Sequence, residues 1–492
     1  MTHEGNVKEY LSTKVIYFLP FMLLIPQQAS KSPWWPFPSS GPVVAMFIGA
    51  TVLLFLYTLE LIRDTKRIKF TTAQKIFLLW AIHTFISYAL VAGGFRPSLE
   101  SIGSRMYTAI PPYFLAFMVF LTIEKNGWKI RHFENVIKVL LFVSAIWSVE
   151  SFITFYLNYQ IPGLWSIGID LGQEWFVSGF TNSLHTVSKA SLIIFWLSLY
   201  MFYMHRKPIY LLFALGAFLT IISNLNRATN ALLIVSILVF IYYFYVRYRH
   251  SYKGLGQKSS LTINRMLSGL FGFVAVLIIV GGGIFVNNFK GSLLADSHGF
   301  IERAYQYARA TEIIIQFPYG TGAGFGYNFC YSEDVPQIYT KDLRNTEPFA
   351  TFSKFYQSGM LGADLQQRYV GEDNVFSIHN FSLNIIMDYG IIALIMLTIY
   401  IFTLFKFLRF SRLLYKSDYQ KLAKIFMCIT LAQGSTFVAM QATYKFFAWM
   451  WLLVFLYSFA KQIIKASIYE QRIHIKKDHN PLSEEIMLAR IY

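Results

Sequence analysis

Charged residues are scarce in this chain. Only 14% of the 492 residues are Asp, Glu, Lys or Arg, whereas 55% are hydrophobic and 18% are aromatic. Soluble globular domains usually contain about 25% charged residues. Long uncharged stretches also recur along the whole chain rather than at one end. This composition excludes an ordinary soluble enzyme and predicts a polytopic membrane protein.

Cysteine is almost absent as well. The two cysteines are Cys330, in a long polar segment, and Cys428, within an apolar run. We expect them to lie at different depths relative to a membrane, where their Cα atoms are too far apart for a disulfide. The fold is therefore not expected to depend on a disulfide framework.

Twelve apolar runs approach the roughly 20 residues that a helix needs to cross about 30 Å of hydrocarbon. A helix satisfies its backbone polar groups within its own segment, so the predicted fold class is all-α. We expect membrane helices over 1–287 and 381–464, a large outer cap over 288–380 and a cytoplasmic tail over 465–492. The runs are 14–28, 41–62, 73–93, 104–123, 135–157, 184–204, 209–224, 230–246, 267–287, 381–408, 424–443 and 446–464.

Acidic residues are few, at 26 against 43 lysines and arginines, which gives a net charge of +17. The basic residues gather in the loops after every second run, and the intervening short loops carry none or one each. By the positive-inside rule the basic loops and both termini face the cytoplasm. Topology thus accounts for much of the charge, and nucleic acid is not an expected partner. The first run is not expected to be a cleaved signal peptide, because Glu4 and Glu9 precede it.

The predicted cap is far longer than an ordinary connection, and such loops tend to be functional when they are not disordered. It contains the amphipathic segment Gly299–Phe317, followed by "PYGTGAGFGYN". The glycines do not indicate a nucleotide site, because no strand and no Walker lysine accompany them. We expect a small helical cap over the outer face.

Three polar features near the predicted outer face have competing interpretations. Arg227 lies in a short turn between two membrane runs, where it either binds an anion or extends to lipid headgroups. Arg303 and, six residues later, Arg309 lie on the amphipathic segment, where a solvated surface arginine is the simpler interpretation. His379 either sits at the interface with Asn380 as a helix N-cap, or accepts a proton from a substrate hydroxyl.

Ionisable residues also fall inside the predicted spans, namely His83, Glu150 and Lys189. Such groups are rare in membrane segments and usually face the protein interior. Glu150 and Lys189 lie towards the outer ends of their runs, so we expect them to reach the interface. A proton relay is the less favoured interpretation, and a ring of polar groups near the outer mouth is the favoured one.

Four segments, in this order, resemble the O-antigen polymerase and ligase superfamily of bacterial membrane glycosyltransferases. They are "SGFTNSLHTVSKASL" (178–192), "NRATNALLIV" (226–235), "RAYQYARATEIIIQFPYGTGAGFG" (303–326) and "HNFSLNIIMDYGIIALIML" (379–397). The third segment has the arginine, the aromatic residue four positions later and the Pro-Gly-Gly pattern of the family at Arg303, Tyr307, Pro318, Gly320 and Gly322, with the glycine spacing shifted by one. The likeness covers about half of the chain, and the first half matches by topology alone.

The resemblance implies a transferase that uses undecaprenyl-pyrophosphate-linked glycans at the periplasmic face of the bacterial inner membrane. Arg227 and Arg303 would hold the donor diphosphate, and His379 would act on the acceptor. Further support is expected from Asn380, Arg105, Lys189 and Arg309.

Arginine supplies a permanent charge and a planar fork that matches phosphate. The outer segments show no Asp-x-Asp and no His/Cys cluster, so we expect a metal-independent, inverting enzyme with no cofactor. The acceptor is either a second lipid-linked glycan, as for a polymerase, or lipid A core, as for a ligase; the long cap favours a polymerase, with a chain-length regulator as a candidate partner. A glycan transporter is the alternative from another class.

Overall fold

The computed structural model describes residues 10–24, 41–64, 70–89, 99–151, 184–223, 227–251, 307–321, 338, 381–416, 420–441 and 450–477. All regular structure within these residues is helical, and they contain no strand. The predicted all-α class is therefore confirmed for the described part of the chain. The predicted run 267–287 and most of the predicted cap lie outside it.

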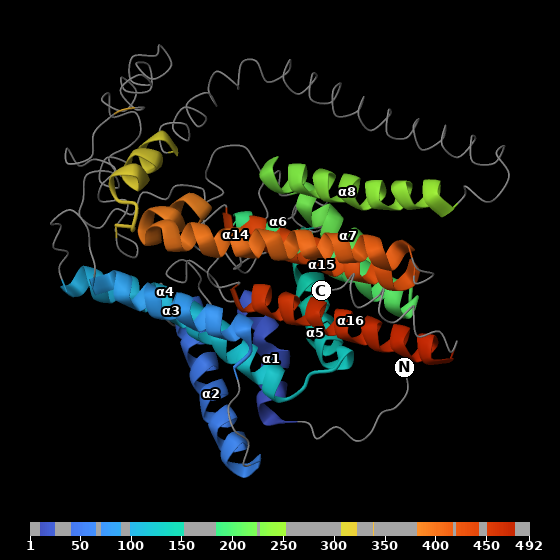
Figure 1. The fold of residues 1–492 in the computed structure, drawn as a ribbon, viewed down its shortest axis with the longest axis horizontal. Coiled ribbons are helices and arrows are strands. Elements are labelled where there is room, and N and C mark those ends of the chain that lie inside the picture. The colour runs from blue at the N-terminus through green and yellow to red at the C-terminus, as the bar shows by residue number, and fades with distance from the viewer. Residues whose placement is uncertain are drawn as a thin grey trace.

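Each predicted run other than 267–287 overlaps a described helix (Figure 1). A further short helix spans 307–316. The labelled helices are α1 (Leu11–Phe18), which continues into the 3₁₀ helix η1 (Leu19–Leu24), α2 (Gly41–Asp64), α3 (Thr72–Ala89), α4 (Leu99–Lys125), α5 (Ile130–Ser151), α6 (Leu184–His205), α7 (Ile209–Ser223), α8 (Arg227–Ser251), α14 (Phe381–Lys416), α15 (Gln420–Gln441) and α16 (Met450–Lys477).

Three described helices are long and apolar enough to cross a membrane, judged by length and composition. These stretches are Val44–Asp64 in α2, Val187–His205 in α6 and Ile385–Ser411 in α14. The apolar parts of α1 with η1, of α7 and of α8 are shorter. Long apolar helices thus indicate a membrane protein, whereas twelve full spans remain a prediction. Polar side chains within helices such as α15, which carries Lys421, Lys424 and Gln433, shorten the apolar stretches.

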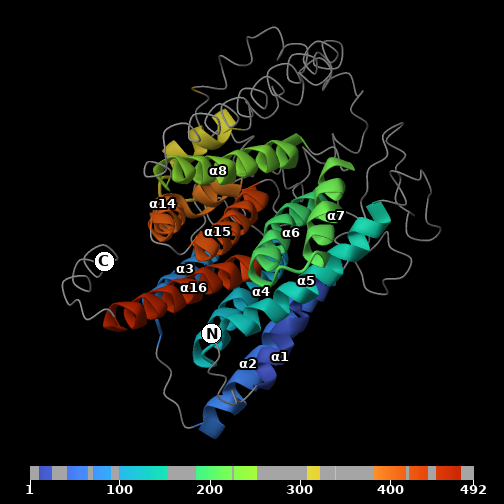
Figure 2. The ribbon, with the colours of Figure 1, turned by 90° about the vertical axis from the view of Figure 1, so that its right-hand side faces the viewer.

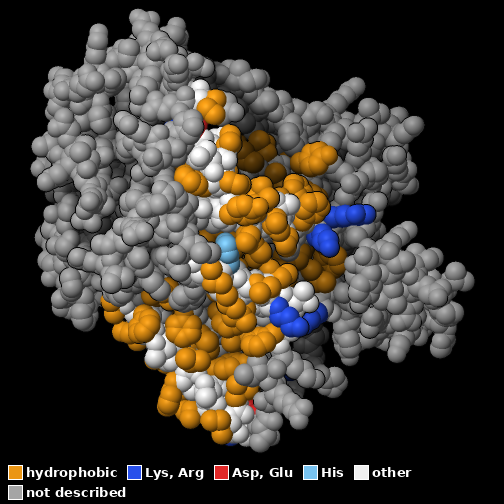
Figure 3. Space-filling model, turned by 60° about the vertical axis from the view of Figure 1, so that its left-hand side comes forward, with side chains coloured by type: hydrophobic (Ala, Val, Ile, Leu, Met, Phe, Trp, Pro, Cys, Tyr) orange, Lys and Arg blue, Asp and Glu red, His pale blue; other side chains and the backbone are white. Residues whose placement is uncertain are grey.

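Helix α6 lies in the interior of the bundle, between α7 and α15 (Figure 2). Its side chains Trp196, Leu197 and Tyr200 are almost fully buried. By contrast, α14 exposes large apolar side chains beyond its first turns, including Ile395 and Phe402. Hydrophobic side chains also cover most of the described surface in Figure 3. Exposed apolar surface of this extent suits contact with lipid rather than water.

Two helices extend beyond the predicted boundaries. Helix α16 continues without interruption to Lys477, past the predicted boundary between membrane helix and tail at 464, and that boundary stays a prediction. Its last part, "KASIYEQRIHIKK", mixes apolar and charged residues, and an amphipathic helix can leave the bilayer without unwinding. Helix α14 likewise continues past 408 to Lys416.

Candidate functional site

Helix α14 is broken near its N-terminal end. Gly390 has φ 64° and ψ −147°, values outside the helical region, and the chain resumes as a helix at Ile391. In an unbroken helix the amide of Ile391 would donate to the carbonyl of Met387. At the break, both groups need other partners, because unsatisfied backbone polar groups are costly away from water.

The segment 318–321 supplies these partners. The amide of Ile391 donates to the carbonyl oxygen of Pro318 at 2.8 Å. The amide and the hydroxyl of Thr321 both donate to the carbonyl oxygen of Met387, at 3.0 and 3.1 Å. One helical hydrogen bond is thus replaced by three bonds to a segment about 70 residues earlier in the chain. In Figure 1 the helix 307–316 and the residues after it lie against the N-terminal part of α14.

Two glycines make this close approach possible. Gly320 has φ 96°, and like Gly390 it adopts a left-handed backbone conformation that favours glycine. A Cβ on Gly390 would overlap the backbone of Pro318 and Tyr319, and a Cβ on Gly320 would overlap the carbonyl oxygen of Asp388. The two backbones therefore touch directly, with no room for a side chain between them.

An aromatic cluster from α3 and α4 supports the other side of the break. The Trp80 ring packs edge-on against Tyr389, with the ring centroids 5.0 Å apart, and Tyr113 lies beside Trp80. His83 Nε2 lies 3.4 Å from the carbonyl oxygen of Tyr389. Because a carbonyl can only accept, a hydrogen bond here requires the tautomer with the proton on Nε2. His83, which the sequence placed in a ring of polar groups near the outer mouth in preference to a proton relay, thus contacts the broken helix.

Arg309 is buried. The simpler interpretation of the sequence, a solvated surface arginine, is therefore wrong for this residue. Its side chain is 1% exposed and donates to Glu312 at 2.8 Å, and the Glu312 side chain is fully enclosed. Both lie on helix 307–316, where residues three apart share a face. A buried, hydrogen-bonded ion pair fixes the inner face of this helix. Within the described residues Arg309 thus forms an ion pair on its own helix, and its support of a donor site stays a prediction.

The first turns of α6 and α8 also meet. The hydroxyls of Ser188 and Thr229 lie 3.3 Å apart and are both buried. Arg227, predicted to lie in a turn, is the first residue of α8. Lys189 is 3% exposed, so the expectation that it reaches the interface is wrong. Helices α7, α8 and α15 all contact α6, the helix that carries Lys189.

Several predicted site residues are not located by the structure. Arg303, His379 and Asn380 lie outside the described residues. Arg105 lies in α4 and Arg227 begins α8, but their side chains are also outside the described set. The structure places residues 318–321, at the end of the segment that follows Arg303, against α14, which follows His379. Contact between the side chains of the predicted site residues stays a prediction.

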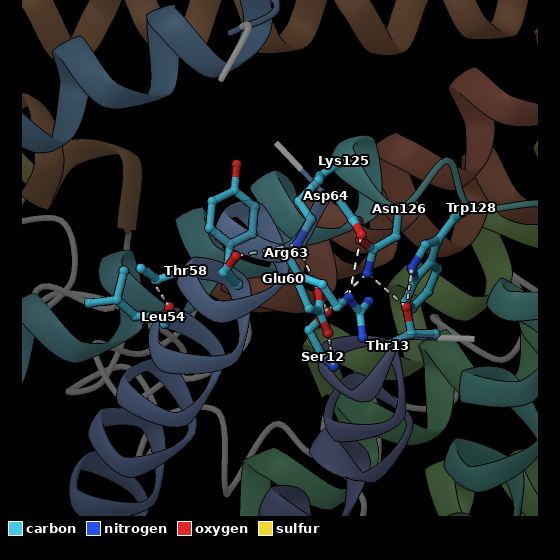
Figure 4. A network of polar contacts seen from close by, with 11 residues as sticks. Ser12, Thr13, Leu54, Thr58, Glu60, Arg63, Asp64, Lys125, Asn126 and Trp128 are labelled. Carbon is cyan, nitrogen blue, oxygen red and sulfur yellow. Dashed lines mark hydrogen bonds and ion pairs between the residues drawn. The ribbon is translucent and has the colours of Figure 1, made fainter. Parts of the chain in front are cut away.

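A buried polar cluster joins the start of α1 to the C-terminal ends of α2 and α4 (Figure 4). Lys125 Nζ lies 2.8 Å from Glu60 Oε2, and the amide and hydroxyl of Ser12 donate to the same carboxylate at 3.0 and 2.7 Å. The Asn126 amide donates to Ser12 and Thr13. These ends all lie on the side that the sequence predicts to be cytoplasmic.

The edge of this cluster includes Tyr10. Lys125 Nζ lies 5.4 Å from the centroid of the Tyr10 ring and 4.6 Å from that of Tyr57. A hydrogen bond to the Asp64 carboxylate raises the pKa of the Tyr10 phenol above its ordinary value. Tyr10 thus remains a neutral donor at physiological pH. The cluster anchors the start of the described chain to α2 and α4.

The contact between 318–321 and α14 is not evident from the sequence pattern. Its signal was present in "PYGT" and "MDYG", where a glycine interrupts an apolar helical pattern.

No protein-family model matches the chain, and a comparison with curated proteins finds no match.

Proposed function

We propose that this protein is a membrane glycosyltransferase that moves a glycan from undecaprenyl pyrophosphate to an acceptor sugar hydroxyl at the outer face. Within this proposal, Arg227 and Arg303 hold the diphosphate of the donor. His379 removes the proton of the attacking hydroxyl. Polymerisation of repeat units is the favoured reaction, and transfer to lipid A core is the alternative.

The observation that carries the proposal is the contact between 318–321 and the break in α14. These residues belong to two of the four segments that resemble the O-antigen polymerase and ligase superfamily. The helix 307–316 begins four residues after Arg303, and α14 begins two residues after His379. A transferase needs its donor site and its base on elements with a fixed mutual position. The contact supplies such a connection.

The chemistry agrees with the residue types. The diphosphate of a polyprenyl donor is already a good leaving group, so the reaction needs no ATP. Negative charge builds on this group as the anomeric bond breaks, and arginine forks stabilise it. The acceptor oxygen attacks the anomeric carbon, and its proton passes to His379. One displacement with the base opposite the leaving group gives inversion.

The test is a transfer assay with the purified protein in bilayer nanodiscs. Undecaprenyl-pyrophosphate-linked glycan is supplied alone or together with lipid A core. A ladder of longer lipid-linked glycans indicates a polymerase, and glycan on lipid A core indicates a ligase. The absence of both products from well-folded protein would refute the proposal.

One observation favours a second candidate, a glycan transporter. Interrupted membrane helices recur at the substrate sites of secondary transporters, and α14 is interrupted at Gly390. In transporters, however, the freed backbone groups face a cavity, whereas here residues 318–321 occupy the break. A transporter would move lipid-linked glycan across vesicle membranes without changing its length, which the same donor preparation can detect.

A further inference from the structure

The contact at Gly390 joins the segment after helix 307–316 to α14 by two hydrogen bonds between backbone groups and one from the Thr321 hydroxyl. Side-chain contacts tolerate small shifts, because rotamers adjust. Here the bonds of Thr321 and Ile391 connect backbone groups directly, and both glycines exclude any intervening side chain. Such a contact fixes distance and register more strictly than side-chain packing does.

The elements on both sides of the contact are themselves rigidly supported. Before it, the ion pair of Arg309 and Glu312 lies on the buried face of helix 307–316 and links two of its turns. Behind it, Trp80 packs on Tyr389 and His83 contacts the Tyr389 carbonyl oxygen. Helix 307–316 is therefore held in a fixed position relative to α14 and, through Tyr389, relative to α3.

We propose that Gly320, Thr321 and Gly390 form a positioning clamp, which sets the helix that follows Arg303 against the helix that follows His379. This inference rests on the proposed function, because it assigns the clamp to the alignment of donor and base. The three residues do not touch substrate. They act by holding two segments in register, and a misplacement of about 1 Å costs on the order of 100-fold in rate.

The first test is independent of activity. Nitroxide labels are placed at Ile315→Cys and Ile395→Cys, two exposed positions on helix 307–316 and on α14 beyond the break. Cys330 is replaced by Ser, and the buried Cys428 is left in place. Pulsed electron spin resonance in nanodiscs should give one narrow distance distribution. A broad distribution would overturn the clamp, whatever the protein's activity.

The second test uses matched glycine variants. Gly390→Ala should broaden the distance distribution and lower kcat for transfer by at least about 10-fold, with KM for the lipid-linked donor within about twofold of wild type. Gly127→Ala is the control. Gly127 also has a positive φ, 59°, but no atom lies within 4 Å of where its Cβ would be. Equal effects of the two variants, or an unchanged kcat in Gly390→Ala, would overturn the inference.

A milder pair keeps the test decisive if Gly390→Ala does not fold. Thr321→Val removes the hydroxyl bond to Met387 and retains the shape and the amide bond, whereas Thr321→Ser restores the hydroxyl. We expect a reduced kcat in the first and near wild-type kcat in the second. A raised donor KM with unchanged kcat in Thr321→Val would show that this segment binds donor and does not position it. Inactive wild-type protein with a narrow distance distribution would refute the transferase alone.

Discussion

Lys125 and Glu60 form an ion pair of 2.8 Å between side chains that are 6% and 7% exposed, and this pair ties the end of α4 to the end of α2. Ser12 donates two further hydrogen bonds to the same carboxylate, so α1 is held as well. A charge buried this far is tolerated only while its partner is present.

Lys125→Met should therefore destabilise the protein strongly. It leaves the Glu60 carboxylate buried without its counter-charge, and such changes cost about 3–5 kcal/mol. Thermal unfolding in detergent, followed by size-exclusion chromatography, measures the loss. Lys138→Met, at an exposed position of α5, is the matched control, and the double variant Lys125→Met/Glu60→Leu should recover part of the loss. A Lys125→Met protein as stable as the Lys138→Met protein would contradict the assignment.

His379→Ala should leave expression and thermal stability intact while transfer is lost. Removing a positioned general base typically lowers the rate by about 100- to 10,000-fold. The measurement is the initial rate of transfer from undecaprenyl-pyrophosphate-linked glycan. His474→Ala, near the end of α16, is the control and should behave as wild type. Wild-type rates in His379→Ala would remove this residue from the mechanism.

Chelation of divalent metal should not inhibit transfer. In the proposed mechanism arginines carry the charge of the leaving diphosphate, a role that a divalent ion fills in many other enzymes. Purified protein is assayed after treatment with EDTA and after later addition of magnesium or manganese. If activity disappears with EDTA and returns with either metal, the charge argument is wrong.

The helices were predictable because their cause is local. Uninterrupted apolar runs indicate helices in lipid wherever they occur, and the run at 184–204 becomes the buried helix α6. The glycine of "MDYG" indicated a weak point in the helix, but the partner of the break at 318–321 was not predictable, because the contact depends on two close backbone approaches that hydrophobic periodicity does not report. The burial of Arg309 was missed for the same reason. Helical spacing allowed an ion pair with Glu312, but it did not indicate that the pair faces the protein interior.

The burial of Arg309 also changes the control for the arginine test. A surface arginine is needed for comparison, and Arg63 provides it, with a side chain that is 54% exposed and lies 3.4 Å from Asp64. If Arg227 and Arg303 grip the diphosphate as planar forks, Lys at either position should lower transfer at least about 10-fold. Lysine keeps the charge but loses the bidentate geometry. Arg63→Lys should retain wild-type activity.

Arg309→Lys separates fork geometry from structural burial. The Arg309→Lys protein should show first a lower unfolding temperature, because the buried Glu312 carboxylate loses its close guanidinium partner. Arg227→Lys and Arg303→Lys should instead unfold at the wild-type temperature and transfer poorly, with the glycan products read as ladder length or as glycan on lipid A core. If all these lysine variants transfer equally well, the arginines form a general basic vestibule. The transporter would then become the better account of the outer face.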